Sequence, residues 1–195
     1  MSYTVYGAVR SRAFRVLWLL EELGVPYTHV PAGPQSDEVR KISPLGKIPV
    51  LVEGDTVLRD STAILTYLAD KHGAFTLPAG TQDRARQDAW TFRILDEVES
   101  LLWTASKHSF VLPEEERVPA IKDPCRAEYA RNLTRIMEEA QGPFLMGDTP
   151  LVPDILLCHC GGWAQSAKFP AGPDSFGAYL ATLRARPAFQ RAAAL

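Results

Sequence analysis

The sequence predicts an α/β domain over residues 1–75, followed by an all-helical domain over residues 82–195. Two observations lead to this division. The first 75 residues carry strand and helix signals in the order β-α-β-α-β-β-α, whereas no convincing strand pattern follows residue 80. Between the two parts, Leu77-Pro78-Ala79-Gly80 has the composition of a linker. This order of elements indicates two domains rather than one.

The amino-terminal elements begin with a β-α-β pattern. Residues 3–6 alternate polar and β-forming side chains and end at Gly7, which is typical of a strand. A helical pattern starts at Ser11, because apolar residues recur at i, i+3, i+4 and i+7 from Val16, and Gly24 closes it. Residues 25–30 are expected to form a second strand. The two strands should therefore be parallel, with a right-handed crossover.

The rest of this domain is expected to contain a short helix, a hairpin and a longer helix. The polar turn Glu53-Gly54-Asp55 joins the two strands of the hairpin. The longer helix directs Ile64, Leu65 and Leu68 toward the core. The expected ranges are 36–42 for the short helix, 50–52 and 56–58 for the strands, and 61–71 for the longer helix.

Helical periodicity accounts for the second half of the chain. No internal repeat and no low-complexity tract interrupts it. Five helical windows are expected, at about 82–106, 124–140, 154–167, 174–184 and 187–193. A row of helices without strands predicts an all-α domain.

The composition excludes several classes of protein. The net charge is −2 and no run of Lys or Arg is present, which argues against a nucleic-acid-binding surface. No apolar stretch approaches the roughly 20 residues needed to span a bilayer, and the amino terminus lacks the layout of a signal peptide. Three cysteines do not suggest a disulfide framework. We therefore expect a cytoplasmic protein with reduced thiols and no membrane or nucleic-acid partner.

Two short motifs predict a binding site for a small charged peptide. An X-Pro bond is the one place where a cis peptide is cheap, so Ile48-Pro49 is a candidate cis turn. Such a turn leaves the amide and carbonyl of Ile48 free to pair with an extended ligand. Ser61 is expected to cap the following helix, whose unpaired amides form a site for a carboxylate.

Taken in order along the chain, these motifs resemble the cytosolic glutathione S-transferases. In the first half, Ile48-Pro49-Val50 matches the cis-proline segment of that family, and Asp60-Ser61-Thr62-Ala63-Ile64 matches its Glu/Asp-Ser-x-Ala-Ile signature. In the second half, Phe144–Asp148 with Pro153-Asp154-Ile155 resembles the entry into a central helix, and 184–189 resembles the family's ending. The resemblance implies a thioredoxin-like N-terminal domain plus an all-α C-terminal domain, the glutathione transferase fold.

The resemblance also implies how glutathione binds. The glutamyl carboxylate would meet the hydroxyl and amide of Ser61, Asp60 would face the ammonium group, and Lys47 would lie near the glycyl carboxylate. Together with Ile48 and Pro49, these residues form the expected glutathione site. Glutathione would act as a co-substrate without a metal, a small electrophile would be the second substrate, and the protein would form a homodimer.

Two residues are candidates for stabilising the glutathione thiolate. Ser11 lies at the start of the first helix, and its hydroxyl can donate to the sulfur; with Arg15 it resembles the serine-type classes. An unperturbed thiol has a pKa of about 8.5, and one hydroxyl donor at a positive helix end lowers it by about 1–2 units. Other classes use a tyrosine at the end of the first strand, so Tyr6 is the rival. We favour Ser11, because Tyr6 should alternate into a face of the sheet.

The second half of the chain contributes few chemical signals. Its cysteines, Cys125, Cys158 and Cys160, lie far from residues 9–12, so a cysteine nucleophile at the thioredoxin position is absent. Consecutive residues of a helix point in different directions, so Cys158-His159-Cys160 is not expected to bind a metal. An apolar electrophile pocket, with ordinary core packing as the alternative, is suggested by Trp103, Ser106, Phe110 and Trp163.

One position departs from the family pattern. Leu151 stands where a Ser or Thr usually caps the central helix, and leucine cannot accept a hydrogen bond from the helix amides. Asp154 must then act alone or with Thr149. The departure concerns local stability rather than function.

Three functions compete at this level. The leading hypothesis is conjugation of the glutathione thiolate to small hydrophobic electrophiles. The alternatives are glutathione-dependent reduction of disulfides or peroxides, and a non-catalytic interaction module of the same fold.

Overall fold

The computed structural model describes residues 2–195. It contains two compact units, one formed by the residues up to Ala79 together with Arg184–Leu195, the other by Gly80–Leu183. None of the helices in residues 2–195 is both long and apolar enough to cross a bilayer.

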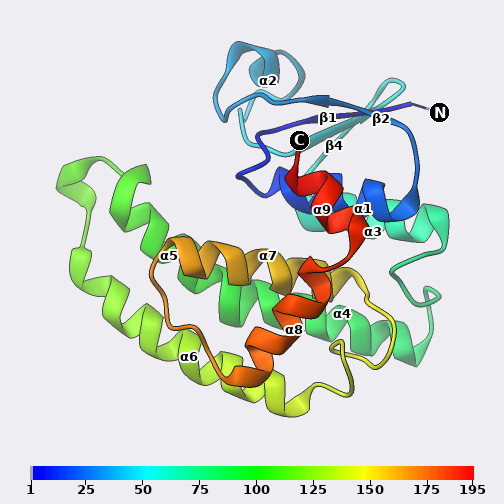
Figure 1. Ribbon diagram of the computed structural model, residues 1–195. Helices are drawn as coiled ribbons and strands as arrows, with labels where there is room; N and C mark the ends of the chain where they lie inside the picture. The colour runs from blue at the N-terminus through cyan, green and yellow to red at the C-terminus, as the bar shows by residue number, and fades with distance from the viewer. Residues whose placement is uncertain (1) are drawn as a thin grey trace. The chain divides into compact units, whose positions relative to one another are not determined.

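The first unit is built on a four-stranded sheet (Figure 1). The strand order is β2-β1-β3-β4, with β1 parallel to β2 and antiparallel to β3, and β3 antiparallel to β4. This is the expected thioredoxin-like arrangement of a β-α-β half followed by a hairpin. Its elements are β1 (Tyr3–Tyr6), α1 (Ala13–Leu23), β2 (Tyr27–Val30), α2 (Asp37–Ile42), β3 (Val50–Glu53), β4 (Thr56–Arg59) and α3 (Ser61–His72).

Alternation along β1 and β3 creates two different faces of the sheet. Val5 pairs with Leu51, and both are fully buried on the face that α1 and α3 cover (Figure 1). Tyr6 pairs with Val50 on the opposite face, because successive side chains of a strand point to opposite sides. There a second cluster forms around Val50, to which α2 contributes Val39 and on which Tyr6 packs.

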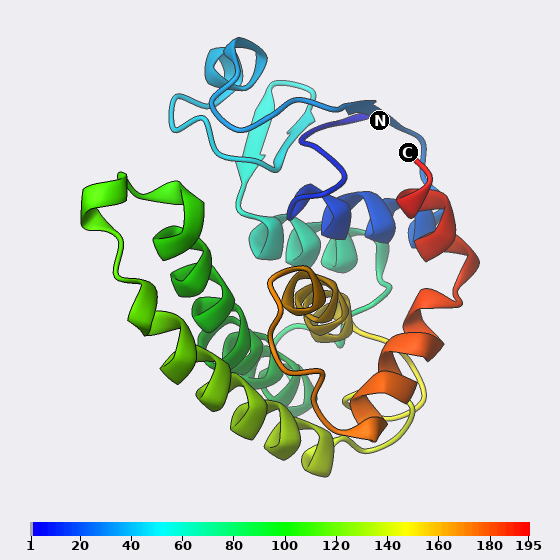
Figure 2. The same ribbon diagram turned by 60° about the vertical axis from the view of Figure 1, so that its left-hand side comes forward.

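The last helix, α9 (Pro187–Ala193), belongs to this first unit. The sequence predicted that it belongs with the preceding helices, but in the structure it lies beside α1 (Figures 1 and 2). Phe189 packs edge-on against Phe14 and Trp18, with ring centroids 5.0 Å apart in both pairs. The Nε and Nη2 groups of Arg186 donate to the carboxylate of Glu22 at 2.6 and 2.8 Å. Aromatic packing and this two-pronged ion pair hold the chain end on α1.

The second unit contains helices and, apart from one isolated bridge between Phe144 and Gly147, no β-structure. The expected helix at 82–106 continues to Val111; one π-helical turn interrupts it and a second forms its end. A π turn adds a residue and leaves a carbonyl without its usual partner; here Nδ2 of Asn132 donates to the Glu97 carbonyl at 2.9 Å. The elements are α4 (Gln82–Ile94), η1 (Leu95–Glu99), α5 (Ser100–Ser106), η2 (Lys107–Val111), η3 (Glu114–Glu116), η4 (Pro119–Ile121), α6 (Lys122–Glu139), α7 (Val152–Ser166) and α8 (Asp174–Arg184).

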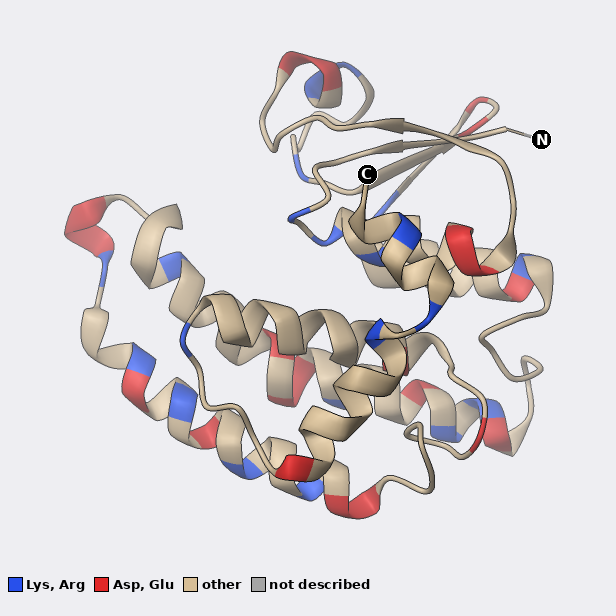
Figure 3. Ribbon diagram, viewed as in Figure 1, with Lys and Arg blue, Asp and Glu red and all other residues tan. Residues whose placement is uncertain are grey.

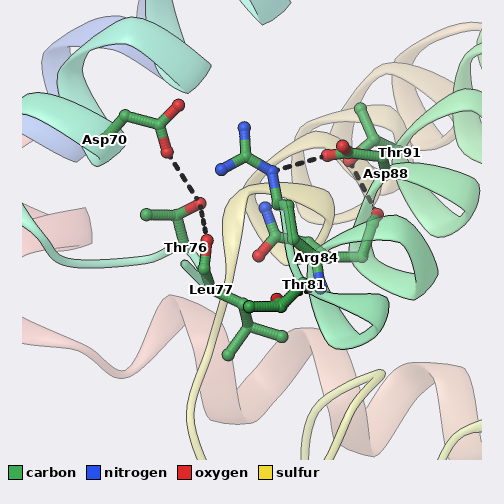
Figure 4. Close-up of polar contacts among 8 residues, drawn as sticks. Asp70, Thr76, Leu77, Thr81, Arg84, Asp88 and Thr91 are labelled. Atoms are coloured by element: carbon green, nitrogen blue, oxygen red, sulfur yellow. Dashed lines mark hydrogen bonds and ion pairs between the residues drawn. The ribbon is translucent and has the colours of Figure 1, made fainter. Parts of the chain in front are cut away.

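Polar contacts define the start of α4 (Figure 4). Oγ1 of Thr81 caps the helix by accepting from the Arg84 amide at 3.1 Å. Nε of Arg84 donates to Oδ1 of Asp88 at 2.9 Å, and the Thr91 hydroxyl donates to the Gln87 carbonyl at 3.1 Å. The helix α6 carries interspersed Lys, Arg, Asp and Glu along its length, as expected for a helix with a solvated face (Figure 3).

The helix α7 is the most buried helix of the second unit, and Asp154 organises its start. The Leu151 side chain makes no cap bond; instead Oδ2 of Asp154 accepts from the Leu151 amide at 2.8 Å and Oδ1 accepts from the Leu145 amide at 3.0 Å. The hydroxyl of Tyr179 donates to Oδ1 at 2.9 Å. Tyr179, rather than Thr149, is therefore the partner of Asp154. Burial raises the pKa of Asp154 to about 6, against the lowering effect of these three donors.

Candidate functional site

The Ile48-Pro49 segment has the geometry that the sequence predicted. The peptide bond between the two residues is cis, which confirms that prediction. Pro49 is buried and Ile48 is half-buried, directly before β3. Within residues 2–195, neither the amide nor the carbonyl of Ile48 has a hydrogen-bond partner. An extended peptide can therefore pair with both groups, as one more strand pairs with a sheet edge.

Gly7 brings the turn before α1 against this segment. Its φ is +149°, and a Cβ at this position would lie 2.5 Å from Cβ of Ala13, 3.4 Å from Cβ of Ile48 and 3.6 Å from Cα of Pro49. Nε2 of His29 donates to the Gly7 carbonyl at 2.8 Å and holds the turn from the side of β2. Only glycine permits this close approach. The turn that carries Ser11 thus lies next to Ile48 and Pro49.

The hydroxyl of Ser11 is already engaged in this turn. It donates to the Ala8 carbonyl at 2.6 Å and accepts from the Ala13 amide at 3.1 Å. The helix α1 starts at Ala13, two residues later than expected, so Ser11 organises the turn before the helix. A ligand sulfur must therefore compete with the Ala8 carbonyl for the hydrogen bond that the Ser11 hydroxyl donates.

At the start of α3, the prediction that Ser61 caps the helix is wrong. Asp60, not Ser61, caps this helix: its Oδ1 accepts from the amides of Thr62 and Ala63 at 2.9 and 3.0 Å. Asp60 also has a φ of +70°, a conformation that costs about 1–3 kcal/mol in a residue other than glycine and that concentrates at functional sites. Asp60 is exposed, so its carboxylate faces both the helix amides and solvent.

Ser61 is the first residue of α3 and is only 3% exposed. Its Oγ accepts a hydrogen bond from Nη1 of Arg15 at 3.2 Å. Arg15 lies in the first turn of α1 and is fully buried. In the sequence, Arg15 stood out only as part of the family resemblance. The available signal was the single charge inside the otherwise apolar run Ala13–Leu20.

The remaining candidates fall into two groups. Lys47 is exposed and makes no ion pair within residues 2–195, so its charge is available to a ligand. Tyr6 packs with its ring on the Val39 and Val50 cluster. These placements favour Lys47 as a ligand contact and a packing role for Tyr6.

Three of the four candidates for the electrophile pocket contact one another in the second unit. The indole Nε1 of Trp163 donates to the Ser106 hydroxyl at 3.2 Å, and Trp103 packs edge-on to Trp163 with centroids 6.5 Å apart. Phe110 is 70% exposed in the last π-helical turn.

Residues 2–195 contain neither an exposed cysteine nor a group of side chains that could bind a metal ion. Cys125, Cys158 and Cys160 are all free and buried. Burial, with Glu128 nearby, raises the pKa of the Cys125 thiol, which keeps it protonated and unreactive. Among residues 2–195, no group of three His, Cys, Asp or Glu side chains is arranged to hold a metal ion.

Comparisons with known proteins agree with this geometry. The glutathione S-transferase N-terminal domain matches residues 5–78. A zeta-class glutathione S-transferase of Euphorbia esula is 30% identical over 163 residues, covering 78% of this chain and 72% of that protein. Glutathione S-transferase Z2 of Arabidopsis thaliana is 45% identical over 67 residues, covering 32% and 30% of the two chains.

Solved structures extend the likeness over the full chain. The theta-class glutathione S-transferase of Xanthomonas axonopodis pv. citri, with glutathione bound, superposes with a TM-score of 0.79 at 28% identity, covering 99% of this chain and 97% of that chain. A glutathione transferase of Methylococcus capsulatus gives a TM-score of 0.83 at 26% identity, with 98% and 97% covered. By fold, motif and sequence identity, the chain belongs to the glutathione S-transferase family.

Proposed function

We propose that this protein transfers the glutathione thiolate to small hydrophobic electrophiles. The observation that carries the proposal is the meeting of three segments in the first unit: the Ser11 turn, the Ile48-Pro49 segment and the start of α3. Gly7 joins the first two, and the bond between Arg15 and Ser61 joins α1 to α3. Each segment offers a different chemical group to a small peptide.

Glutathione fits these groups along its length. The free amide and carbonyl of Ile48 suit the peptide backbone around cysteine. The Asp60 carboxylate accepts hydrogen bonds from the ammonium group, while the Ser61 hydroxyl donates one to the glutamyl carboxylate. The exposed Lys47 suits the glycyl carboxylate. Charge-assisted hydrogen bonds of this kind are about twice as strong as neutral ones.

Ser11 is the proposed thiolate stabiliser. On binding, the Ser11 hydroxyl rotates so that it donates its hydrogen bond to the sulfur instead of to the Ala8 carbonyl, while the Ala13 amide continues to donate to the oxygen. A hydroxyl that receives a hydrogen bond becomes a better donor, which strengthens the bond to a charged sulfur. The thiolate is the nucleophile, so a lower thiol pKa increases its fraction near pH 7.

The electrophile and the oligomeric state complete the proposal. Trp103 and Trp163 supply apolar, aromatic surface suited to a hydrophobic co-substrate. The homodimer is proposed from the likeness to the family, and Tyr67 on α3, 37% exposed, and Phe92 on α4, 66% exposed, are candidate side chains for its interface. Three free thiols fit a cytoplasmic, reducing environment.

Two measurements on the purified protein test this function. Calorimetry with glutathione should show saturable binding, and a chloronitrobenzene should be conjugated in a glutathione-dependent reaction. Binding without conjugation, together with turnover of mixed disulfides or peroxides, would assign the protein to reduction instead. Binding without any turnover would leave a non-catalytic module, and absence of binding would reject the glutathione site. Sedimentation of a 21.5 kDa species at micromolar concentration would exclude the homodimer.

A further inference from the structure

Two residues of β2 fix the backbone of Gly7, just before the turn that carries Ser11. His29 pairs with Val5, so its side chain lies on the face of the sheet that α1 covers. Its Nε2 donates to the Gly7 carbonyl at 2.8 Å, and the Gly7 amide donates to the Val30 carbonyl at 3.0 Å. Because glycine adopts many backbone conformations at little cost, these two hydrogen bonds restrict the turn to one of them.

The Gly7 carbonyl is linked directly to the acceptor of the Ser11 hydroxyl. The Gly7 carbonyl and the Ala8 amide belong to one planar peptide group, so a bond to that carbonyl sets the direction in which Ala8 continues. The Ala8 carbonyl then accepts from the Ser11 hydroxyl at 2.6 Å and from the Ser11 amide at 3.0 Å. The bond from His29 therefore acts next to the residue that orients this hydroxyl.

Gly7 also contacts the residue that donates to the Ser11 hydroxyl. A Cβ on Gly7 would lie 2.5 Å from Cβ of Ala13. The amide of Ala13 donates to Oγ of Ser11 at 3.1 Å. The acceptor and the donor of the Ser11 hydroxyl are thus both adjacent to Gly7. A rotation of the Gly7 backbone would change both contacts, and the hydrogen bond from His29 opposes that rotation.

We infer that His29 is a positioning residue that, through Gly7, aims the Ser11 hydroxyl at the sulfur of glutathione. This inference rests on the proposed function, since it specifies what holds the proposed thiolate stabiliser in place. Water could satisfy a carbonyl beside the half-buried His29 equally well. Only a side chain fixed on a strand holds the peptide group in one direction.

The test compares two substitutions that differ by one methylene group. The amide nitrogen of glutamine falls close to the position of Nε2 in histidine, so His29→Gln keeps a donor for the Gly7 carbonyl, whereas His29→Asn is too short. The thiolate absorbance of bound glutathione should titrate in His29→Gln as in the wild-type protein. In His29→Asn the thiol pKa should rise by about 0.5–1 unit, and conjugation near pH 7 should fall roughly threefold to tenfold, with recovery at higher pH.

Two controls separate the aim of the hydroxyl from the shape and stability of the site. S-methylglutathione has no thiol to ionise, so its affinity by calorimetry should differ by less than about twofold among these proteins. Tyr27→Phe removes a 2.7 Å hydrogen bond from the same strand to Glu21 of α1, and it should leave the thiolate titration unchanged. His29→Phe keeps an aromatic ring but no donor, so it should behave like His29→Asn and replaces that variant if it folds poorly.

A purely structural role for His29 predicts other results. An unshifted titration in His29→Asn, or an equal shift in His29→Gln or in Tyr27→Phe, would overturn the inference. Equal losses of affinity for glutathione and S-methylglutathione in His29→Asn would overturn it too. These outcomes are distinct from a failure of the proposed function, in which the wild-type protein binds neither ligand.

Discussion

Asp60 and Ser61 divide the start of α3 between them. The Asp60 carboxylate accepts from two amides of the helix, while the Ser61 hydroxyl turns to Arg15 of α1. The helix cap is therefore a different side chain from the proposed donor to the glutamyl carboxylate, and Asp60 combines capping with a proposed contact to the ammonium group. Substitutions at the two positions can separate stability from binding.

Asp60→Asn tests whether Asp60 contacts the ligand in addition to capping the helix. Asparagine is as good a cap as aspartate and tolerates a positive φ, so stability should change by less than about 0.5 kcal/mol. Glutathione affinity should fall by roughly tenfold, because the ammonium group loses a charged partner. Thermal unfolding and calorimetry on the same samples measure both effects. Asp60→Ala is the matched control: it also removes the cap, and alanine tolerates the positive φ less well, so it should cost at least about 1 kcal/mol of stability. Unchanged affinity in Asp60→Asn would limit Asp60 to a capping role.

Gly7→Ala should disturb the contact between the turn before α1 and the Ile48-Pro49 segment. The new Cβ would lie 2.5 Å from Cβ of Ala13, at a φ of +149° that other residues rarely adopt. The turn must move away from Ile48, so we expect a loss of about 1–3 kcal/mol in stability and a clear loss of glutathione affinity. Gly54→Ala is a suitable control, because Gly54 also has a positive φ but no atom within 4 Å of its added Cβ. Equal glutathione affinity in the two variants would show that the close contact at Gly7 does not shape the site.

Asp154 should make stability depend on pH. Its pKa is 3.8 in the reference state and about 6 in the fold, so the native protein holds a proton that the unfolded chain has released. This contribution to stability is complete below pH 4, falls as the pH rises toward 6, and amounts to about 3 kcal/mol over that interval. Unfolding curves of the wild-type protein and Asp154→Asn between pH 4 and 7 isolate it by difference. A difference that does not vary with pH would contradict the raised pKa.

Phe189→Ala should release the chain end from α1. Its ring contacts both Phe14 and Trp18, and truncation of a partly buried phenylalanine removes about 2 kcal/mol of stability. Arg191→Ala is the control: its side chain is 56% exposed and its ion pair with Glu21 contributes at most about 1 kcal/mol. Denaturant unfolding followed by tryptophan fluorescence measures both. Similar losses of stability in the two variants would show that ion pairs hold α9 on α1 as strongly as the aromatic packing does.

Local patterns were sufficient for most of the fold, because strand alternation and helical periodicity are read within one element. The ends of α8 and α9 match the expected ranges, and β3 and α3 differ by only one residue. The π-helical turns inside 82–111 were not foreseen, since the sequence periodicity there resembles that of an ordinary helix. The association of α9 with α1 was also missed, because it depends on contacts between residues about 170 positions apart.

The site was predictable where a residue type has few alternatives. Proline at position 49 indicated the cis bond, and Asp60 and Ser61 were both recognised as residues of the α3 start. Which of the two caps the helix depends on the positive φ of Asp60, which the sequence does not reveal. The link from Arg15 to Ser61 spans 46 positions and needs the packing of α1 on α3.

The assignment of Ser11 as the thiolate stabiliser is best tested by a pH titration of the bound glutathione thiolate, followed by ultraviolet absorbance, in the wild-type protein, Ser11→Ala and Tyr6→Phe. In the wild-type protein the thiol pKa should lie about 1–2 units below its free value of roughly 8.5. Ser11→Ala should return it toward that value and reduce conjugation near pH 7 by roughly tenfold to a hundredfold, with recovery at higher pH. Tyr6→Phe should leave the titration unchanged. An unshifted titration in Ser11→Ala together with a shifted one in Tyr6→Phe would contradict the assignment of Ser11.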